Sequence, residues 1–150
     1  TLGDVRRQLE FPLFVKPLTE TKSFAGSVLS QESDLGRLTH LDDEMRLQAS
    51  EVVEFASEWR YFVHRNAIVG LSHYRGDWSR TPDPSIVRRA VEDYHGAPAA
   101  YCLDFGVTAT NRTLLVEAND AFALGPHGLD AVIYAKMLED RWSEITKSRT

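Results

Sequence analysis

The sequence predicts an α+β fold in which antiparallel sheets pack against helices. Segments with the short apolar runs or the two-residue alternation of strands outnumber segments with helical spacing. Short, turn-like connections join neighbouring strand segments, and such connections favour antiparallel pairing. Helical patterns stand at both ends of the chain. This arrangement of strands and helices is typical of the α+β class.

The first third of the chain predicts a helix, two strands and a helical turn. The apolar run FPLFVKP contains two prolines and predicts a strand, and the hydroxyl-rich segment LTETKSFAG predicts a loop. In order, the expected elements are a short helix over Leu2–Glu10, a strand over Phe11–Pro17, a loop over Leu18–Gly26, a return strand over Gly26–Ser30 and a helical turn or short helix over Asp34–Leu41.

The middle of the chain predicts three strand segments followed by a helix. Arg65-Asn66 is a two-residue connection that predicts a hairpin, and Ala56-Ser57 is expected to form a turn before it. The expected elements are strands over Glu51–Phe55, Glu58–His64 and Ala67–Tyr74, a loop over Gly76–Pro84 and a helix over Pro84–Tyr94.

The last third predicts two strands and a closing helix. Tyr101–Val107 has apolar side chains at every second position, the pattern of a strand with one buried face. Thr113–Ala118 is its expected antiparallel partner, and Leu129–Ile145 has helical spacing. No repeat or low-complexity linker divides the chain, so one domain over residues 1–150 is expected. Because the sequence starts at Thr1, directly in a charged segment, we expect a C-terminal portion of a longer chain.

The composition excludes several classes of protein. Of the 150 residues, 43% are hydrophobic and 26% are charged, and the formal net charge of -5 argues against a dedicated nucleic-acid surface. No apolar run approaches the roughly 20 residues of a membrane helix, and no signal-peptide pattern opens the chain. The one cysteine, Cys102, cannot form an internal disulfide, which fits the cytoplasm as the expected location.

Oxygen-bearing side chains gather at the end of the strand LLVEAND. Side chains alternate along a strand, so Glu117 and Asn119 point the same way. If Thr110-Asn111 are the two central turn residues, antiparallel pairing places Asp104 opposite Glu117 on one face. A divalent cation relieves the repulsion between such carboxylates, and oxygen ligands suit Mg²⁺ or Mn²⁺. The alternative is a solvated strand end, with Asp104 paired to a lysine or an arginine.

The motif FVKP places Lys16 inside an apolar strand. Lysine is rarely buried without a partner, so an anion is expected near its ammonium group. The loop that follows contains Lys22 and Gly26, and its backbone N–H groups can approach a phosphate. It lacks the G-x-x-x-x-G-K-[ST] pattern of a Walker A loop. The alternative is a salt bridge at the sheet edge.

The segment EVVEFASEWRYFV presents an acid and a guanidinium on one strand face. Glu58, Arg60 and Phe62 share that face, and the other face is expected to be core. A carboxylate can accept from hydroxyl groups and a guanidinium can clamp an anion at two points. Arg75, after the return strand, can add a second guanidinium. The alternative is an ordinary cross-strand ion pair.

The order FVKP, SFAG, VVEFASEWR, YCLDFGV and LLVEAND resembles the ATP-grasp superfamily. The resemblance runs from about Phe11 to Trp142 and looks closest to a compact branch named for a shared lysine and two arginines. Members usually have an additional N-terminal region that completes the nucleotide cleft. This chain begins only about fifteen residues before Lys16, so we expect the N-terminal part of the fold to be missing or reduced.

The resemblance implies a role for each residue that matches a motif. Lys16 corresponds to the lysine that contacts the nucleotide phosphates, and Thr21–Gly26 to the loop that covers them. The segment with Glu51, Val53 and Glu54 corresponds to the hinge that binds adenine, largely through its backbone. The other implied roles are ribose binding by Glu58, Mg²⁺ ligation by Asp104, Glu117 and Asn119, and action on the γ-phosphate or an acyl-phosphate by Arg60 and Arg75, with Arg80 and Arg141 as competitors of Arg75.

The implied activity is ligation of a carboxylate to an amine at the expense of ATP, with Mg²⁺ and through an acyl-phosphate. A peptide or a protein is among the substrates that this chemistry allows. Metal ions, a lysine and guanidinium groups neutralise the charge that spreads during phosphoryl transfer. The first alternative is a non-catalytic module that binds nucleotide without turnover. The second is a structural α+β domain whose motifs match by accident.

Overall fold

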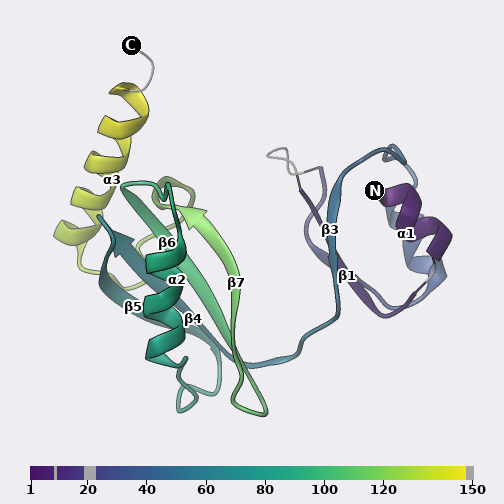
Figure 1. Ribbon diagram of the computed structural model, residues 1–150, viewed down its shortest axis with the longest axis horizontal. Coiled ribbons are helices and arrows are strands. Elements are labelled where there is room, and N and C mark those ends of the chain that lie inside the picture. The colour runs from purple at the N-terminus through teal and green to yellow at the C-terminus, as the bar shows by residue number, and fades with distance from the viewer. Residues whose placement is uncertain (9, 19–22, 148–150) are drawn as a thin grey trace. The chain divides into compact units, whose positions relative to one another are not determined.

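The computed structural model describes residues 1–8, 10–18 and 23–147 of the chain (Figure 1). The chain forms two compact units, the N-terminal unit (Thr1–Val53) and the C-terminal unit (Glu54–Thr150). Each unit contains one sheet, and both sheets are antiparallel. The predicted α+β class is therefore confirmed. Among the described residues, no helix has the length and the hydropathy needed to cross a membrane.

The N-terminal unit is a three-stranded sheet with one buried face. Val15 on the central strand is fully buried, and its neighbours Phe14 and Lys16 on the opposite face are half-buried, because side chains alternate along a strand. The elements are α1 (Leu2–Gln8), β1 (Leu13–Pro17), β2 (Ser27–Leu29), the 3-10 helix η1 (Glu32–Leu38) and β3 (Leu47–Ser50), with the strand order β2-β1-β3. The core consists of Leu2, Val5, Val15, Leu29 and Leu38.

The predicted strand over Glu51–Phe55 is wrong. The third strand of the N-terminal sheet is β3, and residues 51–54 form a connection without regular structure. Val52 and Val53 gave this connection its apolar, strand-like signal, but both are only half-buried. β3 is an edge strand whose two central residues are exposed, so it lacks the alternation that marks a strand with a buried face.

The C-terminal unit is a four-stranded sheet with a helix on each face (Figure 1). The strand order is β5-β4-β6-β7, so β5 and β7 are the two edges. The elements are β4 (Phe55–His64), β5 (Ala67–Gly76), α2 (Pro84–Asp93), β6 (Ala100–Thr108), β7 (Thr113–Asp120), the 3-10 helix η2 (Ala121–Ala123) and α3 (Ala131–Lys147).

Local signals explain where two of these elements begin and end. Arg65 and Asn66 form the predicted hairpin turn, with φ angles of 49° and 62°, the left-handed conformation that a two-residue hairpin turn needs. Helix α2 starts after Asp83, whose carboxylate accepts a hydrogen bond from the Ser85 backbone N–H at 2.8 Å. Pro84 at the first helical position loses no hydrogen bond there.

The turn predicted at Ala56-Ser57 is also wrong. Both residues belong to β4, and an irregularity in the pairing with β6 lies between Phe55 and Ser57. Ser57 is fully buried and its hydroxyl accepts a hydrogen bond from the Trp59 indole N–H at 2.8 Å. The pair Ala56-Ser57 therefore marks a local irregularity within a strand rather than a chain reversal.

The two faces of the C-terminal sheet differ in character. One face packs on α2 through Trp59, Tyr61, Val63, Tyr101, Leu103 and Phe105. The opposite face is apolar at one end only, where Phe62 and Cys102 pack against Met137 of α3. Further along the same face, the cross-strand partners are polar: Arg60 lies opposite Asp104, and Glu58 lies opposite Gly106. Thus α3 covers the apolar end of this face, and the polar end carries the candidate site.

Candidate functional site

Asp104 and Glu117 lie directly opposite each other on β6 and β7, as the sequence predicts. They face the same side of the sheet as Arg60, the partner of Asp104 on β4. The polar patch, defined as Glu58, Arg60, Asp104 and Glu117, is thus assembled within one unit from three neighbouring strands. Asp104 is 1% exposed and Glu58 and Arg60 are each 8% exposed, whereas Glu117 is exposed.

A β-bulge produces the Asp104–Glu117 pairing. Phe105 pairs with Leu115 and Asp104 with Glu117, so Val116 is an extra residue on β7. Without it, Asp104 would face Val116. The predicted two-residue turn is wrong: the hairpin closes between Thr108 and Arg112, with Asn111 at a φ of 60°. The bulge compensates for the difference in the turn, and the predicted partner of Asp104 is right for that reason.

Arg60 forms a two-point ion pair with Asp104. Its Nε donates to Oδ1 at 2.7 Å and its Nη2 donates to Oδ2 at 2.6 Å. The hydrogen bond to Asp104 raises the pKa of the Arg60 guanidinium, against the opposing effect of burial. We expected Arg60 to stand beside Glu58, but its charge partner is on the neighbouring strand. The alternative interpretation of Asp104, a pairing with an arginine, describes the ion pair that is present.

Glu58 is held from the other side by two residues of β5. Arg75 Nη1 donates to Glu58 Oε1 at 2.9 Å, and the Tyr74 hydroxyl lies 3.2 Å from Glu58 Oε2. Burial, followed by the charges of Asp104 and Glu58, raises the pKa of Tyr74 well above its ordinary value, so the phenol stays neutral. The hydroxyl therefore acts as a donor to the Glu58 carboxylate.

The donors present fit a Mg²⁺ ion in type and number. Among the described residues Glu117 has no hydrogen-bond or ion-pair partner, and Asp104 keeps unused lone pairs beyond its two bonds to Arg60. Asn119 lies opposite Cys102, and its buried Nδ2 has no hydrogen-bond partner in the described structure. The described residues contain no cluster of three or more His, Cys, Asp or Glu that could hold a metal. Two carboxylates and an amide oxygen, completed by phosphate and water, are the usual Mg²⁺ environment.

Lys16, Glu51 and Val53 belong to the N-terminal unit. Lys16 pairs with Gln48 of β3 on the sheet face opposite Val15, and it has no ion-pair partner among the described residues. The expected anion, or the alternative salt bridge, is thus absent from the described part of the chain. Thr21 and Lys22 of the expected phosphate loop lie outside the described residues, and Glu54 starts the C-terminal unit.

The competing arginines and the cysteine have structural partners. Arg80 donates to the Asn111 side chain at 2.7 Å, in the β6–β7 hairpin. Arg141 binds Asp120 through Nη2 at 2.5 Å and Glu144 through Nη1 at 2.8 Å, which ties α3 to the end of β7. Burial raises the pKa of the Cys102 thiol to about 12, as befits a core residue. Of the three arginines weighed for the second role, only Arg75 contacts the polar patch among the described residues.

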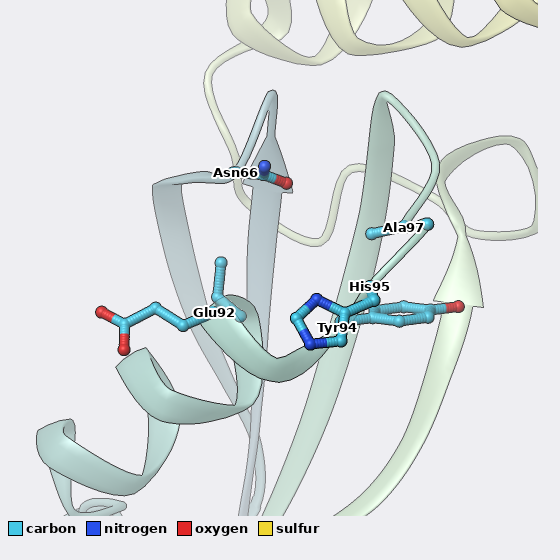
Figure 2. A pocket seen from close by; sticks show the side chains of 7 residues that line it. Asn66, Glu92, Tyr94, His95 and Ala97 are labelled. Atoms are coloured by element: carbon cyan, nitrogen blue, oxygen red, sulfur yellow. The ribbon is translucent and has the colours of Figure 1, made fainter.

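A pocket of the C-terminal unit lies away from the polar patch, at the end of α2 (Figure 2). Val91 of α2, which lines it, belongs to the core on the α2 face of the sheet, whereas the polar patch is on the opposite face. The lining residues are Asn66, Val91, Glu92, Tyr94, His95, Gly96 and Ala97. None of them is a predicted site residue, so this pocket adds nothing to the candidate site.

Tyr74 is the residue that sequence reasoning missed. The turn at Arg65-Asn66, counted back without bulges, places His73 opposite Glu58, whereas the structure pairs Glu58 with Arg75. Two irregularities in the β4–β5 pairing account for the difference of two residues. No pattern in the sequence signals them, because bulges depend on how two strands fit together.

Solved structures with the same fold are ATP-grasp proteins. The RimK domain protein ATP-grasp from Sphaerobacter thermophilus is 16% identical with a TM-score of 0.55, over 79% of this chain and 47% of that chain. N5-carboxyaminoimidazole ribonucleotide synthetase from Thermotoga maritima is 18% identical with a TM-score of 0.53, over 77% and 33%. The ATP-grasp ligase PsnB, complexed with precursor peptide PsnA2 and AMPPNP, is 16% identical with a TM-score of 0.55, over 79% and 40%. The chain thus spans less than half the length of each.

The family itself follows from the sequence match. A model of the ATP-grasp domain, for family 2 of the clade named for two arginines and one lysine, matches residues 1–137. The chain therefore belongs to this ATP-grasp family, and the predicted membership is confirmed. A comparison with curated proteins gives no match.

Proposed function

We propose that the chain is part of an ATP- and Mg²⁺-dependent ligase that joins a carboxylate to an amine. The observation that carries the proposal is the polar patch, in which Asp104 and Glu117 face each other beside the guanidinium of Arg60. This arrangement, in a member of an ATP-grasp family, suits the handling of a metal-bound triphosphate. Peptides or proteins are the proposed substrate class, supported by the precursor peptide bound to the structurally similar PsnB.

The metal site is assigned to Asp104, Glu117 and Asn119. Asp104 is fixed by its ion pair, Glu117 is free among the described residues, and Asn119 contributes an amide oxygen. When bound, Mg²⁺ neutralises phosphate charge and orients the phosphates for in-line transfer. Mn²⁺ has the same preference for oxygen ligands and is the expected substitute.

The arginines keep donors for phosphate. A guanidinium has five N–H donors, and Arg60 uses those of Nε and Nη2 on Asp104 while Arg75 uses Nη1 on Glu58. The remaining donors of both can bind the γ-phosphate or an acyl-phosphate. Lys16 is assigned to the nucleotide phosphates on the same chemical ground, because among the described residues its ammonium group has no anionic partner.

The nucleoside is assigned to Glu58 and to the connection before β4. Glu58 presents a carboxylate that can accept from two ribose hydroxyls. The segment with Glu51, Val53 and Glu54 lies in a stretch without regular structure, so its backbone groups are not committed to a sheet. Such groups can hydrogen-bond the adenine edge.

The proposed reaction needs no protein nucleophile. A substrate carboxylate oxygen attacks the γ-phosphorus of ATP, and ADP leaves. The amine nitrogen then attacks the acyl carbon, the C–O bond to phosphate breaks, and a proton leaves the nitrogen as the amide forms. Arg60 and Arg75 neutralise the charge on the transferred phosphoryl group. The buried, neutral Cys102 takes no part.

The proposal is tested with hydroxylamine as a simple amine. The protein is incubated with ATP, Mg²⁺ and a panel of carboxylates that runs from amino acids to peptides, and ADP and hydroxamate are both measured. The proposal predicts equal amounts of ADP and hydroxamate, with peptides preferred, and loss of both in Arg75→Met. Bound ATP without ADP would support the non-catalytic module instead, and ADP without hydroxamate would indicate simple hydrolysis.

A further inference from the structure

Tyr74 touches both ion pairs of the polar patch. Its hydroxyl lies 3.2 Å from Glu58 Oε2, and the Arg60 Cζ lies 5.7 Å from the centroid of its ring. Glu58 is already bound by Arg75, and Arg60 is already bound by Asp104. One side chain therefore connects the two ends of the patch in a continuous series of contacts, all within the C-terminal unit.

A β-bulge puts Tyr74 there. Glu58 pairs with Arg75 and Trp59 pairs with His73, so Tyr74 is the extra residue of β5 with no cross-strand partner. In a regular strand, Tyr74 and Arg75 would point to opposite faces. At the bulge both reach Glu58 instead. Bulges of this kind re-aim side chains and are frequent next to functional sites.

We propose that Tyr74 is a positioning residue that couples the ribose end of the nucleotide site to its phosphate end. This inference rests on the proposed function, in which Glu58 binds ribose hydroxyls and Arg60 acts on phosphate. Tyr74 contacts no reacting atom itself. It acts through the two residues that it holds.

The hydroxyl fixes the orientation of the Glu58 carboxylate. Tyr74 binds Oε2 and Arg75 binds Oε1, so the carboxylate cannot rotate freely, and its other lone pairs keep one direction for ribose hydroxyls. Because 74% of the Arg75 side chain is exposed, Arg75 alone is a weak constraint. Tyr74→Phe removes the hydroxyl and keeps the ring, so it isolates this contribution.

The ring supports the guanidinium of Arg60. A cation beside an aromatic face is attracted by the negative π surface, and the ring also limits where Arg60 can move. Any movement of Arg60 toward a phosphate takes place along this ring. Tyr74→Leu removes the ring together with the hydroxyl, so a comparison with Tyr74→Phe separates the two contributions.

The test compares three nucleotides by calorimetry in the presence of Mg²⁺. The dissociation constants of ATP, 2′,3′-dideoxy-ATP and ADP are measured for the wild type, Tyr74→Phe, Tyr74→Leu and Glu58→Gln. The ratio of dideoxy-ATP to ATP reports the ribose end, and the ratio of ADP to ATP reports the γ-phosphate end. Tyr94→Phe is the matched control, because Tyr94 packs on Tyr101, on the α2 face of the sheet. Thermal unfolding verifies that each variant folds.

The proposal predicts two distinct changes. In Tyr74→Phe the preference for ATP over dideoxy-ATP falls about 3- to 10-fold, and the preference for ATP over ADP stays at the wild-type value. In Tyr74→Leu both preferences fall, the second by about 2- to 5-fold. Tyr94→Phe changes neither. A structural role alone would weaken all three nucleotides equally and leave both ratios unchanged.

The contrary outcomes separate the inference from the function on which it rests. If the wild type binds ATP but Tyr74→Phe keeps both ratios, the coupling role of Tyr74 is wrong and the proposed function stands. If Glu58→Gln keeps the ribose ratio, Glu58 is not the ribose ligand and the inference falls with that assignment. If the wild type binds no ATP, the proposed function itself fails and takes the inference with it.

Discussion

Arg60 and Asp104 are direct cross-strand partners, and the guanidinium of Arg60 binds both oxygens of the Asp104 carboxylate. Only 2% of the Asp104 side chain and 10% of the Arg60 side chain are exposed. A buried charge is tolerated only when it is paired and hydrogen-bonded. The pair therefore keeps a carboxylate ionised in the sheet, where an opposing Glu117 would otherwise favour its protonation.

Removal of one partner of this pair is expected to destabilise the protein strongly. Arg60→Met leaves the Asp104 charge buried without compensation, at a cost of about 3–5 kcal/mol in the free energy of unfolding. The double variant Arg60→Met/Asp104→Leu loses less than the sum of the single variants. Urea unfolding measures both effects. Arg89→Met, at an exposed ion pair on α2, is the control and is expected to be neutral. Additive losses would contradict the description of a coupled buried pair.

Arg75 and Arg141 are expected to differ in what they support. Arg141 joins α3 to Asp120 and Glu144, so Arg141→Met lowers the free energy of unfolding by about 1–3 kcal/mol and leaves ATP affinity unchanged. The largely exposed Arg75 contributes little to stability, so Arg75→Met weakens ATP binding by about tenfold without a stability loss. Urea unfolding and calorimetry on both variants check this. Loss of ATP affinity in Arg141→Met alone would move the second functional arginine to α3.

Asp140 is expected to make stability depend on pH in the acid range. Hydrogen bonds from Arg65 and then from His64 hold the pKa of Asp140 below its ordinary value of 3.8. The folded carboxyl thus releases its proton more readily than the unfolded one, and its contribution is present above pH 3.8 and lost as the pH falls through the folded pKa. Asp140→Asn should therefore lose more stability at neutral pH than at about pH 3. An equal loss in urea unfolding at both pH values would contradict this.

Cys102 is expected to be unreactive in the folded protein. It is 1% exposed, and burial raises the pKa of its thiol to about 12, so almost no thiolate is present at about pH 8. A maleimide should label Cys102 only after unfolding, whereas a cysteine introduced by Ser79→Cys in an exposed loop should react at once. Labelling followed by mass spectrometry measures both rates. Equal rates in the folded state would show that the α3 face opens freely.

The sequence predicted the residues of the polar patch better than it predicted their contacts. Alternation correctly placed Glu58, Arg60 and Phe62 on one face, because a strand has a fixed period. The partner of Asp104 was right only because a bulge at Val116 offset an error in the turn. The contacts of Tyr74 and Arg75 with Glu58 were missed, because both depend on irregularities between strands that a single strand's sequence does not encode.

The hairpin at Arg65-Asn66 and the strand β3 show the same contrast. The hairpin was predictable because its two residues must adopt positive φ, and asparagine does so more readily than most residues. β3 was missed because an edge strand with exposed central residues carries no apolar alternation. Local backbone demands can be read from sequence, whereas strand pairing at a sheet edge is decided by the neighbouring strand.

Glu117, opposite Asp104, is assigned to the metal that ATP binding requires, and the proposed function depends on this assignment. The most direct measurement is calorimetric titration of ATP with and without Mg²⁺, for the wild type, Glu117→Ala and the control Glu139→Ala on an exposed position of α3. We expect the wild type and Glu139→Ala to bind ATP much more tightly with Mg²⁺, and Glu117→Ala to lose most of this gain while its thermal stability is unchanged. Equal Mg²⁺ dependence in all three proteins would contradict the assignment.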